Sequence, residues 1–254
     1  MNRPLIHLSA RPLPSESDPA PPVDQLPVTS RRGLILLGVG TLGAGLTLGT
    51  GTALAAPVLR KGSRGSAVTT LQKNLNSLGY WCGTADGSFG HVTEQAVYAI
   101  QKVAGLGKDG VVGAKTQAAI AAKKKPRSAV TSGSSFDIDL KRQILICYTG
   151  GRVKWTFNTS TGSGERYYSG GRWKTATTPK GSFRMYRLHS AGWQTGSLGR
   201  LYRPGYYDRG WAIHGSTSIP PYPASHGCAR ISTAATDLLW RENWIVKDRR
   251  VLVR

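Results

Sequence analysis

The sequence Ser225-His226-Gly227-Cys228-Ala229-Arg230, preceded by Ala212-Ile213-His214-Gly215, brings one thiol, two imidazoles and two glycines into a short part of the chain. A thiol attacks a carbonyl only as its thiolate, and a free cysteine with a pKa of about 8.5 is mostly protonated at neutral pH. A neighbouring imidazole, His214 or His226, must therefore serve as its base. The two motifs predict that Cys228 is the nucleophile of an acyl-transfer reaction.

The positions of the two histidines favour His214 as the base. His226 is two positions from Cys228, so on an extended strand the two side chains would share a face, whereas a turn at Gly227 would separate them. If His226 is turned away, His214 is the remaining imidazole. The loop of residues 217–223 could bring His214 and the thiol together at the ends of two strands.

Other groups near Cys228 could supply the remaining parts of such a site. The carbonyl of Gly215 could accept the N–H of the His214 ring and fix its tautomer, as an aspartate does in a serine triad. The backbone N–H groups of Gly227 and Cys228 are natural donors to an oxyanion, because glycine lets the main chain approach a substrate carbonyl closely. Arg230 could pair with a substrate carboxylate.

The same side chains have a rival use as metal ligands. His214, His226 and Cys228 could hold a zinc ion as a set of two histidines and one cysteine. The sequence shows neither a clear fourth ligand nor a metalloprotease motif. We therefore expect no metal and no cofactor.

At these residues the chain resembles the L,D-transpeptidase family of the YkuD type, whose pattern is a histidine, a loop, and then Ser/Thr-His-Gly-Cys followed by a small apolar residue and Arg or Asn. The resemblance covers residues 136–253 and includes Thr178-Pro179-Lys180-Gly181, which is similar to a Thr-Pro-x-Gly turn of that family. It implies that Cys228 is the nucleophile, His214 the proton acceptor and donor, and Gly215 the orienting carbonyl. The oxyanion and substrate-binding positions that it implies are Ser225, His226, Gly227 and Arg230.

The resemblance also implies a reaction. Cys228 would attack the carbonyl of the third residue of a peptidoglycan tetrapeptide stem, release the terminal D-alanine and hold the rest as a thioester. The amine of a second stem would resolve the thioester to a 3→3 cross-link, whereas water would make the protein an L,D-carboxypeptidase. A further alternative is a catalytically silent wall-binding protein, against which the intact pair of His214 and Cys228 argues.

A sequence repeat lies before this domain. Residues 86–97, with the sequence DGSFGHVTEQAV, are echoed by residues 109–120, with the sequence DGVVGAKTQAAI. Each unit predicts an Asp-Gly turn followed by a short helix with a threonine, Thr93 or Thr116, as its N-cap. In the first of these helices the apolar spacing continues to a stop at Gly105.

A third helix is predicted before the repeat, from a cap at Ser66 to a stop at Gly79. Its apolar residues at helical spacing are Val68, Leu71, Leu75 and Leu78. Together the three helices resemble the type 1 peptidoglycan-binding domain, notably in residues 62–68, 71–72 and 79–80, which implies peptidoglycan stem peptides and glycan as partners. Trp81 could stack on a glycan ring, or Tyr80 and Trp81 could simply close the small core.

The pattern changes to a period of two from Phe136 onward, which predicts a mainly β, sandwich-like domain and so an α+β chain overall. The helix expected here is residues 233–240, after a cap at Ser232. Strands are expected at residues 136–140, 143–148, 152–158, 181–188, 210–215 and 250–253. The glycine-rich stretch 160–208 is expected to form substrate walls, where Tyr202, Arg203, Tyr206 and Tyr207 could flank a peptide stem or could cap the sheet edge.

The net charge of the chain indicates which classes of partner to expect. Its 34 Lys and Arg residues against 13 Asp and Glu residues give a formal net charge of +21. Such a surface attracts polyanions. No helix-turn-helix, RNA-recognition or zinc-finger pattern organises the basic residues, so we expect anionic cell-wall polymers and no nucleic acid.

The first 56 residues predict export. Ser30-Arg31-Arg32-Gly33 precedes an uncharged, glycine-diluted apolar run, which is typical of a twin-arginine signal, and Ala53-Leu54-Ala55 fits a cleavage site. The mature protein would begin near Ala56 and act in the cell wall or outside the cell. The alternative is an uncleaved membrane anchor, because the run is long enough to span a bilayer.

The predicted order is thus a leader and signal (1–56), a peptidoglycan-binding domain (57–122), a flexible basic linker (123–135) and the catalytic domain (136–254). Cys82 and Cys147 fall in different predicted domains. They could pair as a disulfide, or each could be a small core residue, which is the reading we favour.

Overall fold

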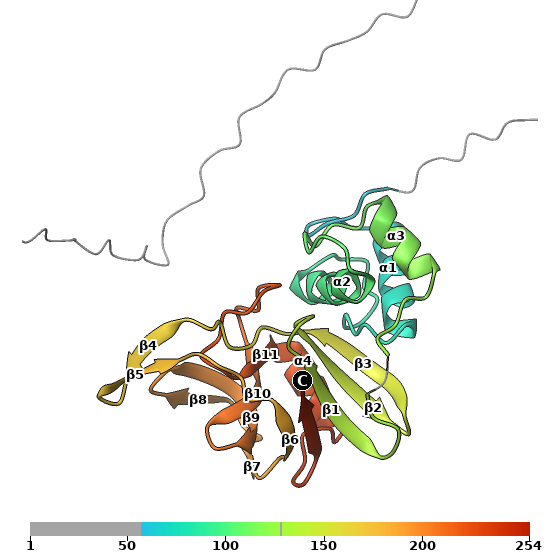
Figure 1. The fold of residues 1–254 in the computed structure, drawn as a ribbon. Helices are drawn as coiled ribbons and strands as arrows, with labels where there is room; N and C mark the ends of the chain where they lie inside the picture. The colour runs from blue at the N-terminus through green and yellow to red at the C-terminus, as the bar shows by residue number, and fades with distance from the viewer. Residues whose placement is uncertain (1–56, 128) are drawn as a thin grey trace, which may run out of the picture. The chain divides into compact units, whose positions relative to one another are not determined.

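The computed structural model describes residues 57–254 except residue 128 (Figure 1). The predicted leader and signal lie outside the described residues. The described residues fall in one compact unit. No helix in the described part of the chain combines the length and apolarity that a membrane crossing needs.

The N-terminal domain contains three helices: α1 (Ser66–Ser77), α2 (His91–Ala104) and α3 (Ala114–Ala121). All four apolar positions predicted for the first helix are buried. Gly105 ends α2 in the left-handed conformation with φ +69°, as predicted. The helices and their buried face are therefore confirmed.

The predicted N-caps are wrong. Glycines occupy the N-cap positions, and Thr93 and Thr116 lie inside the first turns of α2 and α3. Each threonine hydroxyl instead accepts a hydrogen bond from a buried glutamine amide, at 3.1 Å from Gln72 and 3.2 Å from Gln101. The same two amides also bind Asp86, Ser88, Asp109 and Val111. In both repeat units, a buried glutamine side chain therefore binds the Asp-Gly turn and the threonine of the helix that follows it.

The C-terminal domain is mainly β. Its strands are β1 (Ser134–Asp139), β2 (Ile144–Thr149), β3 (Arg152–Asn158), β4 (Arg166–Ser169), β5 (Arg172–Thr175), β6 (Gly181–Arg184), β7 (Arg187–Leu188), β8 (Trp193–Gly196), β9 (Gly199–Asp208), β10 (Trp211–Ser216), β11 (Ala229–Ser232) and β12 (Arg250–Val253). One sheet has the order β3-β2-β1-β12-β6, and a second has the order β11-β10-β9-β7 with β8 on β9. A separate hairpin joins β4 and β5.

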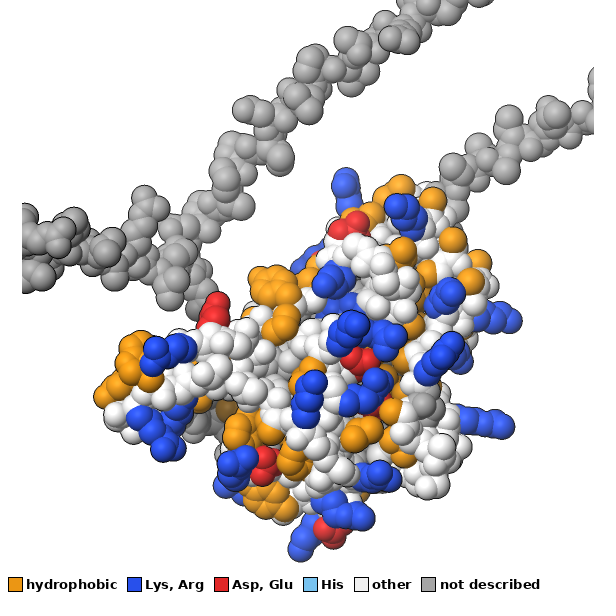
Figure 2. Space-filling model, viewed as in Figure 1, with side chains coloured by type: hydrophobic (Ala, Val, Ile, Leu, Met, Phe, Trp, Pro, Cys, Tyr) orange, Lys and Arg blue, Asp and Glu red, His pale blue; other side chains and the backbone are white. Residues whose placement is uncertain are grey.

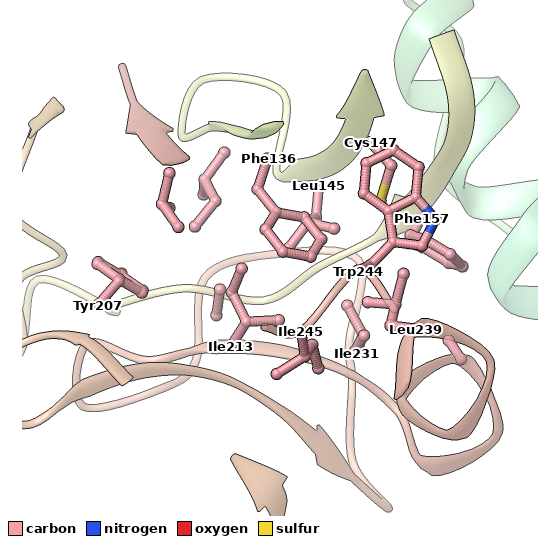
Figure 3. Close-up of a cluster of buried hydrophobic side chains, with 14 of the residues drawn as sticks. Phe136, Leu145, Cys147, Phe157, Tyr207, Ile213, Ile231, Leu239, Trp244 and Ile245 are labelled. Carbon is pink, nitrogen blue, oxygen red and sulfur yellow. The ribbon is translucent and has the colours of Figure 1, made fainter. Parts of the chain in front are cut away.

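A single apolar core joins the two larger sheets. Phe136 on β1, Ile213 on β10 and Val251 on β12 are each fully buried in it. Helix α4 (Thr233–Arg241) adds Leu239, and Figure 3 shows side chains of this cluster reaching toward one another. The predicted sandwich is therefore confirmed. The predicted helix cap is also confirmed, because the Ser232 hydroxyl accepts a hydrogen bond from the N–H of Ala235 at 3.1 Å.

The segment predicted as a flexible linker makes fixed contacts in the structure. Val130 is 4% exposed and packs with Ile144, Ile146 and Tyr148 of β2. The Tyr148 hydroxyl donates to the carbonyl of Arg127 at 2.6 Å, and the Tyr80 hydroxyl donates to the carbonyl of Lys124 at 2.8 Å. The two ends of the connection are thereby held to the two domains.

The tyrosine and tryptophan after α1 are structural. Tyr80 is fully buried in the helical core, and Trp81 packs edge-on against Phe157 of β3 with ring centroids 6.5 Å apart. The glycan-stacking alternative for Trp81 is therefore not supported. All three cysteines are free, with Cys82 in the helical core and Cys147 in the β core, so the core reading of both is confirmed.

Candidate active site

Two parallel strands bring the predicted nucleophile and base together. In the register of β10 with β11, His214 lies beside Arg230 and Ile213 lies beside Ala229. Cys228 immediately precedes β11, so its thiol and the His214 ring come from adjacent strands. Both side chains line the same cavity.

His214 is held as a neutral imidazole. The ring is 4% exposed, and its Nδ1 lies 2.9 Å from the carbonyl oxygen of Gly215. The pKa of His214 is lowered from 6.5 to about 4: burial is the main cause, the hydrogen bond to the Gly215 carbonyl opposes it, and the charge of Arg230 adds a smaller lowering effect. With the Nδ1 proton donated to a carbonyl, Nε2 carries the free lone pair that a base needs.

Cys228 is half-buried and is held as a thiol. Burial raises its pKa above 9.0, and a hydrogen bond from the backbone of Ala212 and the charge of Arg230 lower it in part. The sulfur lies 3.6 Å from the carbonyl of Gly210. Because the His214 pKa is low and the Cys228 pKa is high, the site favours a neutral pair over a thiolate and imidazolium pair.

The turn before the thiol is fixed from within by Ser225. Its hydroxyl accepts from the N–H of Gly227 at 2.9 Å and donates to the carbonyl of Cys228 at 2.7 Å. Gly227 has φ +142°, which disfavours any side chain, and a Cβ there would collide with the Trp211 indole nitrogen. Glycine is required at this position for both reasons.

The same turn is fixed from outside by Thr178. Its hydroxyl donates to the carbonyl of Gly227 at 2.6 Å and accepts from the N–H of Gly162 at 2.9 Å. Trp211 adds a bond from its indole N–H to the carbonyl of Thr177 at 2.9 Å. In the sequence Thr178 was marked only by its place in the Thr-Pro-Lys-Gly turn, and no role was predicted for it.

His226 packs against Tyr167 of β4, and that it does not act as the base stays a prediction. Its side chain is exposed, and its ring meets that of Tyr167 on β4 edge-on, with centroids 4.7 Å apart. Both rings line the cavity that holds Cys228. His226 and Tyr167 thus belong to the wall of this cavity, and the roles predicted for His226 stay predictions.

The cavity around Cys228 has a volume of roughly 790 Å³ and a strongly basic lining. Its charged side chains are Arg172, Lys174, Arg187, Arg200, Arg209 and Arg230. Among the described residues no aspartate or glutamate lines it. Figure 2 shows that Lys and Arg side chains are also spread widely over the visible face of the molecule, with few acidic ones between them.

The four residues proposed for a substrate wall have different roles. Tyr206 lines the cavity, and the Arg187 guanidinium lies over its ring at 4.0 Å. Tyr207 is buried in the core, and Tyr202 packs against Trp193. The guanidinium of Arg203 forms an ion pair with Asp237 at 2.5 Å, which joins β9 to α4. The cavity wall also includes the β4–β5 hairpin, Arg187 and residues 196–201 of the β8–β9 hairpin, which lie within the stretch 160–208 expected to form substrate walls but were not singled out in the sequence.

The rival zinc site receives no support from the geometry. In residues 57–127 and 129–254, no group of three or more His, Cys, Asp or Glu side chains is arranged to hold a metal ion.

Comparison with known proteins agrees with this geometry. Residues 134–253 match the family of L,D-transpeptidase catalytic domains (YkuD), and residues 64–120 match the peptidoglycan binding domain family. The crystal structure of an L,D-transpeptidase from Xylanimonas cellulosilytica is 46% identical, with a TM-score of 0.75, and the match covers 77% of this chain and 97% of that one. The chain belongs to the L,D-transpeptidase family and carries an N-terminal peptidoglycan-binding domain.

Curated relatives share shorter stretches. The chain is 47% identical over 77 residues to the N-acetylmuramoyl-L-alanine amidase CwlL of Bacillus licheniformis, which is 28% of this chain and 21% of that protein. It is 32% identical over 103 residues to a spore cortex-lytic enzyme of Bacillus cereus, which is 40% of each. The chain therefore spans less than half the length of these relatives.

Proposed function

We propose that this protein is an exported peptidoglycan L,D-transpeptidase with Cys228 as its nucleophile. The observation that carries the proposal is a neutral imidazole, His214, oriented by the carbonyl of Gly215 and placed on the strand beside the only thiol that lines the cavity among the described residues. Cys82 and Cys147 are buried in the two cores and do not reach it.

In the acylation step, Nε2 of His214 accepts the thiol proton as the Cys228 sulfur attacks the carbonyl of the third stem residue. Since the neutral pair is favoured, proton transfer accompanies the attack and the thiolate does not accumulate beforehand. The imidazolium then protonates the leaving amine of the terminal D-alanine. The product of this half-reaction is a thioester.

Negative charge on the attacked carbonyl oxygen requires nearby N–H donors. The Gly227 N–H is engaged by the Ser225 hydroxyl, so the proposal assigns the N–H of Cys228 as the donor. The Ser225 and Thr178 hydrogen bonds hold the peptide units on both sides of Gly227. This fixed turn supports a preorganised oxyanion site.

The basic cavity supports an anionic donor. Stem peptides carry a terminal carboxylate and, with some third residues, a second one, and the guanidinium groups of Arg187 and Arg230 suit such groups. No acidic side chain in the described lining competes for these guanidinium groups. Desolvation of Arg230 lowers its pKa, so an incoming carboxylate meets an incompletely hydrated cation.

The thioester is resolved by an acceptor. An amine from the third residue of another stem would give a 3→3 cross-link, and water would give a tripeptide, as in an L,D-carboxypeptidase. Both acceptors would use the same His214 as base. The peptidoglycan-binding domain would raise the local concentration of stems, and the net charge of +21 would favour anionic wall polymers.

Intact-protein mass spectrometry with a carbapenem tests the assignment of the nucleophile. We expect one covalent adduct on the wild-type protein, on Cys82→Ala and on Cys147→Ala. Cys228→Ala should give none, while it should still sediment with isolated cell walls. An adduct that survives Cys228→Ala would overturn the assignment, and wall binding without any adduct on the wild type would favour the silent binder.

A further inference from the structure

A buried lysine joins the helical domain to the catalytic domain. Lys102 on α2 is 5% exposed, and its ammonium donates to the carbonyl of Gln143 at 2.7 Å, to that of Thr159 at 3.3 Å and to the Asn158 side-chain oxygen. All three acceptors belong to the β domain. None of the ion pairs among the described residues includes Lys102.

A second residue of α2 reaches the same place. The side-chain oxygen of Gln95 accepts from the Asn158 amide at 2.6 Å, and this amide also donates to the carbonyl of Ile219 at 3.1 Å. Ile219 is buried in the loop between His214 and Cys228. Asn158 is therefore held on one side by two side chains of the helical domain and holds the catalytic loop on the other.

The residues after Asn158 continue this support toward the thiol. The Thr159 hydroxyl donates to the carbonyl of Arg230 at 2.7 Å, and the Ser160 hydroxyl donates to the carbonyl of Tyr222 at 2.8 Å. The carbonyl of Thr161 accepts from the N–H of Ser225 at 2.9 Å. Residues 158–161 thus bind the catalytic loop before, within and after the Ser-His-Gly-Cys turn.

A buried ammonium without a counter-charge is an unfavourable way to join two domains. Burial, with a smaller effect of the Lys108 charge, lowers the pKa of Lys102 to about 7, so the fold works against the charged form. An apolar side chain of similar length would pack there without that cost. What the ammonium adds is three directed hydrogen bonds that fix the carbonyls of Gln143 and Thr159 and the rotamer of Asn158.

We propose that Lys102 and Gln95 of the peptidoglycan-binding domain are positioning residues for the catalytic loop of residues 217–230. The helical domain then forms part of the framework that aligns Cys228 with His214, in addition to any tethering to the wall. The activity readout of this inference rests on the proposed transpeptidase function. Reactivity of the Cys228 thiol provides a readout that does not.

The first variants are Lys102→Met and Gln95→Leu in the full chain, with Lys115→Met as the matched control because Lys115 is an exposed lysine of the same helical domain. We expect kcat with disaccharide-tetrapeptide donors to fall about tenfold or more in Lys102→Met and severalfold in Gln95→Leu, with KM changed less than twofold. The control should keep the wild-type kcat. Binding to isolated cell walls should be unchanged in all three.

The second readout is the rate of iodoacetamide modification of Cys228, followed by peptide mass spectrometry. Cys82 and Cys147 are buried, so modification of the native protein reports on Cys228. We expect the modification rates of both α2 variants to differ from that of the wild type at least threefold, and the rate of Lys115→Met to match it. A purely structural role would lower the melting temperature and leave kcat and the modification rate of the folded protein unchanged, which would overturn the inference.

The outcomes separate the two proposals. If the wild-type protein neither turns over donors nor forms a thioester, the transpeptidase function fails, and the modification rates still decide the positioning role. If the wild type is active and both α2 variants keep its kcat and modification rate, the positioning role fails alone. If Lys102→Met does not fold, Gln95→Leu, which keeps the ammonium and its three acceptors, decides the question by the same two criteria.

Discussion

The hydroxyl of Thr178 donates a 2.6 Å hydrogen bond to the carbonyl of Gly227, the residue immediately before Cys228. Ser225 binds the N–H of the same glycine, so the peptide groups on both sides of Gly227 are held by side-chain hydroxyls from two separate segments. This double attachment fixes the direction of the Cys228 N–H, which the proposed mechanism uses as the oxyanion donor.

Replacement of Thr178 by valine should weaken both the turn and the reaction. The change leaves the Gly227 carbonyl and the Gly162 N–H without their partner in a buried position, which costs about 1–3 kcal/mol of unfolding free energy. We expect the rate of Cys228 acylation by a carbapenem to fall at least tenfold. Thr177→Val is the control, because that side chain is exposed. Equal acylation rates in the two variants would contradict the role given to Thr178.

A methyl group at Gly227 should be tolerated poorly. Gly227→Ala places a Cβ against the Trp211 indole nitrogen and 2.8 Å from the carbonyl of Thr177, at a φ of +142°. We expect a loss of about 2 kcal/mol or more in urea unfolding together with loss of acylation. Gly107→Ala, where a Cβ meets nothing within 4 Å, should behave as wild type. Wild-type activity in Gly227→Ala would show that the turn can move without harm.

The buried His214 predicts a particular acid sensitivity. Its folded-state pKa of about 4 lies below its ordinary value of 6.5, so between these pH values the unfolded chain binds more protons than the folded one. Stability should therefore fall as the pH drops from 6.5 toward 4, by about 3 kcal/mol in all. Urea unfolding at pH 7, 5.5 and 4.5 should show that His214→Gln loses this component, while His226→Gln, which changes an exposed ring, keeps it. If the unfolding free energies of the wild type and His214→Gln changed with pH in the same way, this result would contradict the assignment of His214 as a neutral imidazole.

Local patterns sufficed for the parts of the fold that depend on neighbouring residues. Apolar spacing at Val68, Leu71 and Leu75 predicted a helix and its buried face, because helical geometry alone puts those positions on one side. The spacing of His226, Gly227 and Cys228 predicted that the His226 imidazole would face away from the thiol, which stays a prediction. The roles of these residues in catalysis remain predictions.

The sequence did not predict contacts between segments that lie far apart along the chain. Thr93 was predicted to cap a helix, but Gln72 from the preceding helix binds its hydroxyl. Arg203 was considered as a residue that could flank a peptide stem, yet its guanidinium forms an ion pair with Asp237 of α4. The segment expected to be a free linker is held by Val130, whose apolar partners on β2 come together only in the fold. In each case a partner far along the chain decided the outcome.

The basic cavity should recognise substrate carboxylates. Arg187→Gln removes a cation that is held over the Tyr206 ring, so we expect KM for disaccharide-tetrapeptide donors to rise about fivefold or more with kcat nearly unchanged. The difference in KM between Arg187→Gln and the wild type should be smaller at high salt, because salt partly screens the attraction between Arg187 and the substrate carboxylate in the wild type. Lys73→Gln, an exposed position on α1, should leave KM at the wild-type value. An unchanged KM in Arg187→Gln would remove this residue from donor recognition.

The most direct test of the account is mass spectrometry of the muropeptides formed when the purified protein is incubated with disaccharide-tetrapeptides. The account predicts cross-linked dimers that have lost one D-alanine, formed by the wild type and by Cys82→Ala but not by Cys228→Ala or His214→Ala. Tripeptides alone would assign the protein as an L,D-carboxypeptidase. Unchanged substrate, from a wild-type protein that still binds cell walls, would contradict the central claim that Cys228 and His214 form an acyl-transfer site.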